Sequence, residues 1–120
     1  MATFIPADES RKLVGVRPAN RRDFQLEELY RLLNCTTIEL VTTFTGDLMV
    51  IDGDGKEVKP KNRRATEMVP FVTVGELKQM LADNPGALFI GIDGWQELPD
   101  DAKADYIAGD ALVCKQSEIR

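Results

Sequence analysis

Apolar residues recur at helical spacing between Asp23 and Asn34. The positions at i, i+3, i+4 and i+7 are Leu26, Leu29, Tyr30 and Leu33. They predict an amphipathic helix that buries one face. Asp23 is a suitable N-cap residue, and Asn34 can end the helix in a left-handed conformation.

Other segments show the two-residue alternation or the β-branched composition of strands. The predicted strands are residues 12–17, 36–43, 48–51, 56–58 and 110–114. The turn Thr45-Gly46-Asp47 joins the second and third of these into an antiparallel hairpin. A tight turn at 52–55 precedes the short edge strand at 56–58. Residues 1–10 are expected to form a loose lead-in.

Helix signals continue in the second half of the chain. Asn62 can cap a brief helix that includes Met68. Residues 73–76 form a capping box for a helix that 84–86, Asn-Pro-Gly, would end. Residues 87–92 are the most apolar run and predict a buried strand or an extended segment. A further short helix is expected over 98–106.

These elements together predict an α+β fold in a single domain. We expect a mostly antiparallel sheet of four or five strands, with the helix at 23–34 packed on one face. The stretch 70–105 would be an inserted helical segment at an edge. The opening residues lack the apolar run of a signal peptide, and no apolar stretch approaches the roughly 20 residues of a membrane span. We therefore expect a cytoplasmic protein with no membrane partner.

The 120-residue chain contains no histidine and two cysteines, Cys35 and Cys114. Without histidine there is no Ser-His-Asp triad, no Cys-His dyad and no imidazole metal ligand. The two cysteines are expected to be small buried hydrophobes, with a disulfide or a reactive thiol as alternatives. We expect no metal, no cofactor and no enzymatic activity.

The net charge of −5 is unevenly distributed, with +1 over residues 1–64 and −6 over residues 65–120. The clearest basic segment holds Lys59, Lys61, Asn62, Arg63 and Arg64. It predicts contacts with the phosphate of a nucleotide or another small anionic ligand, with a solvated loop or a protein contact as alternatives. The acidic balance argues against general nucleic-acid binding.

Two aromatic residues are candidates for stacking or for an interface, Trp95 and Phe71. A tryptophan packed in the core is the alternative for Trp95. A catalytic reading would pair Glu39 with Asp93 or Asp110, but their spacing singles out no pair.

Two acidic segments resemble metal sites, and each also has a purely structural interpretation. Asp52-Gly-Asp54-Gly partly matches the pattern of a calcium-binding loop, but Lys56 occupies a ligand position, so a turn is expected. Asp100, Asp101 and Asp105 would form either a cation site or the acidic start of a helix.

Several of these segments, taken in order, resemble a family found in phages, prophages and conjugative elements, domain of unknown function 3846. The matching residues are 23–29, 37–41, 46–52, 62–67 and 109–114. The resemblance covers about residues 10–68 and 106–116 and leaves the insertion uncovered. The family brings no catalytic residues that carry over to this chain.

The resemblance implies an accessory protein of a mobile element. We expect a non-catalytic binding protein that acts on a host protein, for example as an antagonist of host defence. The alternatives are a protein that sequesters a nucleotide-like or other anionic ligand, and a structural or regulatory domain with no dedicated ligand. A homo-oligomer is compatible with the first two.

Overall fold

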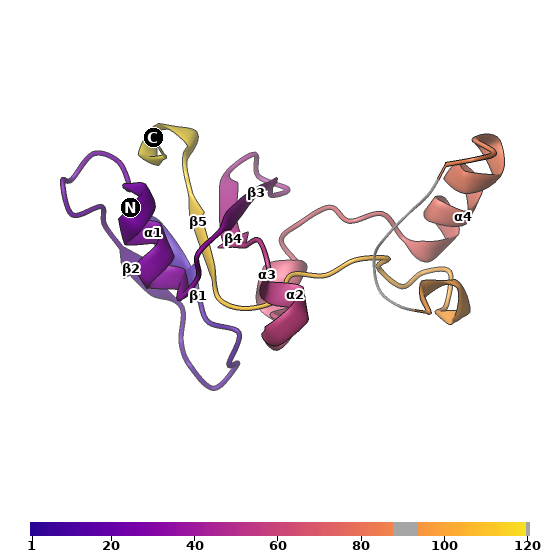
Figure 1. Ribbon diagram of the computed structural model, residues 1–120, viewed down its shortest axis with the longest axis horizontal. Helices are drawn as coiled ribbons and strands as arrows, with labels where there is room; N and C mark the ends of the chain where they lie inside the picture. Colours follow the sequence, from indigo (N-terminus) through magenta and orange to yellow (C-terminus); the bar gives the residue numbers. More distant parts are fainter. Residues whose placement is uncertain (88–93, 120) are drawn as a thin grey trace. The chain divides into compact units, whose positions relative to one another are not determined.

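The computed structural model describes residues 1–87 and 94–119, and Figure 1 shows their course. The chain forms two compact units, Met1–Pro70 with Ile107–Arg120, and Phe71–Tyr106. The second unit coincides to within one residue at each end with the predicted insertion at 70–105. The single-domain hypothesis stays a prediction.

The first unit is built on one antiparallel sheet, which confirms the predicted α+β fold. Its strand order is β2-β1-β5-β4-β3. The strands are β1 (Ala2–Ile5), β2 (Val14–Val16), β3 (Ile38–Thr42), β4 (Leu48–Asp52) and β5 (Ala111–Cys114). The hairpin predicted around Thr45 to Asp47 is confirmed, because β3 pairs with β4 in the register Leu40↔Val50.

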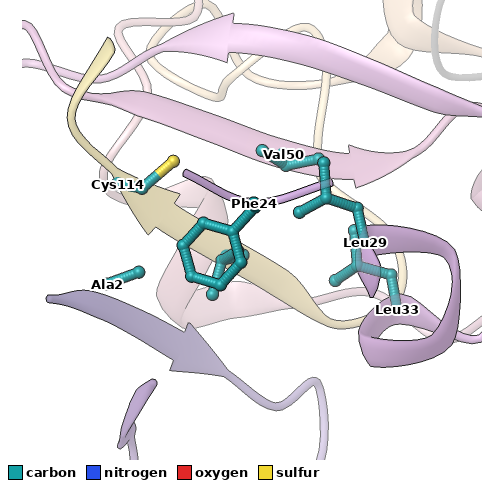
Figure 2. Packing of buried hydrophobic residues seen from close by; sticks show 7 residues of the cluster. Ala2, Phe24, Leu29, Leu33, Val50 and Cys114 are labelled. Carbon is teal, nitrogen blue, oxygen red and sulfur yellow. The ribbon is translucent and has the colours of Figure 1, made fainter. Parts of the chain in front are cut away.

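Helix α1 (Leu26–Leu33) packs on one face of this sheet. Its buried residues Leu29 and Leu33 join a cluster with Phe24, and Figure 2 shows them facing one another. The sheet and chain ends contribute Ala2, Val50, Leu112 and Cys114 to the same cluster. The opposite face of the sheet is buried as well, since Met49 is fully inaccessible. A strand buried on both faces explains the uninterrupted apolar run of β4.

The start of α1 differs from the prediction. The N-cap residue is Gln25 rather than Asp23, whose carboxylate instead accepts hydrogen bonds from the side chains of Asn20 and Gln25. Because the helix begins later, Phe24 stays extended and reaches the core, while Leu26 remains 46% exposed. The predicted end is confirmed, since Asn34 adopts a left-handed φ of 50°.

Two further predictions in this unit are wrong. Residues 1–10 are no loose lead-in, because β1 lies between β2 and β5 and pairs with both. Residues 56–58 form no edge strand but belong to the short helix α2 (Gly55–Val58). The sheet edge beyond β4 is already occupied by β3, so the chain turns away after Asp52. The brief helix α3 (Arg63–Thr66), capped by Asn62, is confirmed.

The second unit contains helix α4 (Val74–Asp83), a short 3-10 helix η1 (Trp95–Glu97) and a small core. The predicted capping box is confirmed: the Thr73 side chain accepts from the Glu76 amide, and the Glu76 carboxylate accepts from the Thr73 amide. The helix predicted over 98–106 is wrong. Its backbone pairs instead with residues 72–75, as in the bonds from Val74 N to Ala102 O and from Ala104 N to Val72 O.

The extended segment predicted at 87–92 lies outside the described residues except for Ala87. A second 3-10 helix, η2 (Gln116–Glu118), follows β5 in the first unit. None of the helices in the described ranges is long and apolar enough to cross a membrane.

Candidate anion-binding site

The basic segment predicted to bind phosphate begins with Lys59, whose ammonium has three partners inside the fold. It donates to the carbonyls of Leu33 and Asn34, each at 2.8 Å, and pairs with Asp52 at 2.8 Å. Carbonyls at a helix C-terminus lack intrahelical partners, so Lys59 satisfies the end of α1 and neutralises a buried carboxylate. Burial raises the pKa of Asp52, but the hydrogen bonds from Lys59 and the Asp54 amide, with the charge of Lys59, outweigh it and lower that pKa.

Asn62 is fully buried and bridges three parts of the first unit. Its Nδ2 donates to the carbonyls of Ile5 and Gly109, both at 2.9 Å. Its Oδ1 accepts from the Ala65 amide at 3.0 Å, which caps α3. Every polar atom of the side chain is therefore engaged within the fold, and its exposure to a ligand would require unfolding.

The two arginines of this segment hold the loop that follows β1. Arg64 donates to the carbonyls of Pro6, Asp8 and Arg11 at 2.6, 3.0 and 2.8 Å. The exposed Arg63 pairs with Glu9 at 2.6 Å. Lys61 forms an isolated backbone bridge with Ala108. The segment thus serves as a clamp within the first unit, and phosphate binding by it stays a prediction.

The aromatic candidates belong to the second unit. Trp95 is buried with Val74, Leu77 and Ala104, so the core interpretation of this residue is confirmed. Phe71 is half-buried, and its carbonyl accepts from Lys103. Both residues belong to a different unit from the basic segment.

The carboxylates weighed for catalysis or metal binding have separate surroundings. Asp110 accepts from the Ala7 amide at 2.9 Å, and Glu39 lies exposed on β3. Asp93 lies outside the described residues. Asp100 pairs with Lys78 across 3.1 Å. Within residues 1–87 and 94–119, no group of three or more His, Cys, Asp or Glu residues is placed to hold a metal ion.

A pocket that the sequence patterns did not reveal lies where the loop between β2 and α1 meets the chain ends. It has a volume of about 270 Å³ and is lined by Met1, Arg17, Pro18, Arg21, Arg22 and Glu118. All three arginines are exposed. In the part of the chain that the structure describes, their guanidinium groups have no hydrogen-bond or ion-pair partner.

Hydrogen bonds within the loop set the positions of these arginines. The Arg21 amide donates to Pro18 O at 2.9 Å, and Asn20 Oδ1 accepts from the amides of Arg22 and Asp23. The loop is tied to α1 by the Ala19 amide, which donates to a carboxylate oxygen of Glu28 at 2.9 Å. The loop is therefore ordered by its backbone amides together with the side chains of Asn20 and Glu28, and none of these bonds involves a guanidinium group.

Arg21 adopts a left-handed backbone with a φ of 63°. This conformation is unfavourable for a long side chain and costs on the order of 1–3 kcal/mol, a strain that tends to occur at functional sites.

Two other residues that line the pocket, Met1 and Glu118, carry paired charges. The Glu118 carboxylate lies 3.2 Å from the Met1 ammonium and accepts from the Lys115 amide at 3.1 Å. Because Glu118 is already neutralised by this ammonium, the three guanidinium groups give the pocket an excess of positive charge. Guanidinium groups favour planar contacts with carboxylate or phosphate oxygens, so the arrangement suits an anionic group.

The sequence contained one signal for this site, the Arg17-Pro-Ala-Asn-Arg21-Arg22 run. Its proline and asparagine indicate a turn, but the sequence alone does not show that this turn places the three arginines at one pocket.

Comparisons with family models, curated proteins and solved structures found no match.

Proposed function

We propose that this chain is a non-catalytic accessory binding protein that recognises an anionic group at the pocket of Arg17, Arg21 and Arg22. The observation that carries the proposal is that three arginines, whose guanidinium groups have no partner in the described part of the chain, line one pocket. Positively charged groups held close together repel one another, and an anion relieves that repulsion. The strained backbone at Arg21 supports the same assignment.

The resemblance to a family of mobile elements supports a setting for this activity. The protein would act in the cytoplasm of a host cell, and the anionic group would belong to a host protein or to a small nucleotide-like ligand. Antagonism of host defence is the form of this function that we favour.

The distribution of charge between the two units supports a local anion site over a general affinity for nucleic acid. Phe71–Tyr106 contains seven Asp or Glu residues and two Lys residues, so it carries the whole net charge of −5. The remaining residues hold 13 basic and 13 acidic side chains and are neutral. Binding along a nucleic-acid backbone needs an extended basic surface, whereas this pocket offers three charges at one point.

A titration with inorganic phosphate at constant ionic strength tests the proposal. We expect saturable shifts of backbone amide signals of residues 17–22 in NMR spectra, and a rise in thermal stability equivalent to about 2.7 kcal/mol at 100 times the dissociation constant. The triple variant Arg17→Gln, Arg21→Asn, Arg22→Gln should lose both effects. Asn at position 21 tolerates the left-handed backbone, which limits any change in folding.

Two controls locate the site. Lys12→Gln removes an exposed charge away from the pocket and should leave binding unchanged. Lys61→Gln with Arg63→Gln tests the segment predicted from sequence. Binding that survives the triple variant and disappears in this double variant would refute our assignment and favour the 59–64 segment.

A further inference from the structure

We infer that the arginine pocket selects a terminal phosphate monoester over a bridging phosphodiester. This inference rests on the proposed function and adds the chemical class of the ligand. The pocket is defined, as above, by Arg17, Arg21, Arg22, Pro18, Met1 and Glu118.

The charge of the site favours a monoester. The pocket is lined by three arginines and by one acidic residue, Glu118, which is itself paired with the Met1 ammonium. A phosphate monoester carries about −1.5 to −2 charges near pH 7, whereas a diester carries one. The positive charge of the site therefore exceeds the single negative charge of a diester or a carboxylate, and a monoester neutralises more of it.

The hydrogen-bond donors of the loop also favour a monoester. The backbone amides of Ala19, Arg21, Arg22 and Asp23 are all engaged within the protein. With these four amides engaged, we expect the guanidinium groups to be the main donors from the loop, and each can donate two parallel hydrogen bonds. A terminal phosphate presents three unsubstituted oxygens to three such groups, and a diester presents two.

The size and lining of the pocket favour recognition of the phosphate group alone. A volume of about 270 Å³ lies below the roughly 300–1,000 Å³ of pockets that enclose a whole drug-sized ligand. The six lining residues include no aromatic ring on which a base could stack. The phosphate would therefore enter the pocket while the rest of the molecule stays outside, so a nucleotide and a phosphorylated side chain share the recognised chemistry.

A matched pair of ligands, methyl phosphate and dimethyl phosphate, tests this inference on the full chain by NMR titration at pH 5 and pH 7.5. The second proton of a phosphate monoester leaves near pH 6, and a diester has no such proton. We expect methyl phosphate to bind at least tenfold more tightly than dimethyl phosphate at pH 7.5, and this ratio to fall at pH 5.

Both ligands meet the same charged groups of the protein, and only the monoester changes its own charge between the two pH values. Among the described residues, the charged groups that line the pocket are Arg17, Arg21, Arg22, the Met1 ammonium and Glu118, and Asp23 and Glu28 are hydrogen-bonded to the loop. The absence of histidine from the chain removes the side chain that most often titrates between pH 5 and 8.

The outcomes separate the inference from the proposed function. Equal binding of the two esters, with a ratio that does not change with pH, would overturn the monoester preference and leave anion binding intact. No binding of either ester or of inorganic phosphate at millimolar concentration would overturn both. Loss of methyl phosphate binding in the triple arginine variant, with Lys12→Gln unchanged, would support both.

Two larger ligands distinguish the sources of the phosphate. Adenosine monophosphate and a short phosphoserine peptide should each bind at least as tightly as methyl phosphate if the carrier stays outside the pocket. Weaker binding of both would show that the pocket excludes attached groups and would contradict the inference. A tenfold advantage for one of them would identify the carrier.

Discussion

The Nζ atom of Lys59 lies 2.8 Å from a carboxylate oxygen of Asp52, and the same ammonium donates to the final carbonyls of helix α1 at Leu33 and Asn34. The two side chains are only 18% and 6% exposed. This ion pair therefore joins the end of β4 to the end of α1 inside the first unit, and phosphate binding by Lys59 stays a prediction.

Replacing Lys59 with Met should destabilise the first unit by about 2–4 kcal/mol, because it leaves the Asp52 carboxylate buried without a counter-charge. Urea denaturation at pH 7, followed by circular dichroism, measures the change. Lys12→Met removes an exposed lysine and is the matched control. A loss no greater than that of the control would mean that the ion pair contributes little.

The same pair predicts a dependence of stability on pH. The folded state lowers the pKa of Asp52 below its ordinary value of 3.8, so its ionised form stabilises the protein above that value, and the benefit is lost as pH falls below 3.8 through the lower pKa of the folded state. Below about pH 4, the free energy of unfolding of the wild type should decrease more steeply than that of Asp52→Asn. Parallel curves for the two proteins would contradict this assignment.

Asn62→Ala should cost about 3–5 kcal/mol, since it leaves the Ile5 and Gly109 carbonyls and the Ala65 amide buried without partners. Denaturant unfolding measures the loss. Asn84→Ala removes an exposed amide with one hydrogen bond, to Met80 O, and should cost less than about 1 kcal/mol. Comparable losses for the two variants would show that burial does not amplify the role of Asn62.

The second unit can be tested through its single tryptophan. Leu77→Ala opens a cavity in the cluster around Trp95 and should lower stability by about 2–4 kcal/mol when unfolding is followed by tryptophan fluorescence. Met80→Ala, on the same helix but 52% exposed, should have a much smaller effect. If both variants unfold at the wild-type urea concentration, the Trp95 cluster does not stabilise this unit.

The two cysteines should differ in reactivity. Burial raises the pKa of Cys114 to about 11, with Glu118 and Asp47 adding to the effect, and burial followed by the charge of Asp52 raises that of Cys35. With iodoacetamide at pH 8, we expect the partly exposed Cys35 to be alkylated before Cys114, and both to react faster in urea. Mass spectrometry of digested protein resolves the sites, and early modification of Cys114 would count against its burial.

The sequence by itself determined the elements that depend on near neighbours. The hairpin of β3 and β4, the left-handed end of α1 at Asn34, the cap at Asn62 and the capping box at Thr73 were all predictable. Each is specified by residues a few positions apart, whose periodicity, turn chemistry and side-chain hydrogen bonds act locally.

The tertiary structure decided the features that depend on contacts between residues far apart in the sequence. Strand β1 enters the sheet because β2 and β5 offer it backbone partners on both sides, a pairing that reaches from Thr3 to Val113. Lys59, Asn62 and Arg64 are used inside the fold because buried carbonyls and a carboxylate, brought close by folding, need donors. The same long-range pairing brings Met1 and Glu118 to the loop of Arg17, Arg21 and Arg22, so the pocket that these residues line forms only once β1 has paired with β2 and β5.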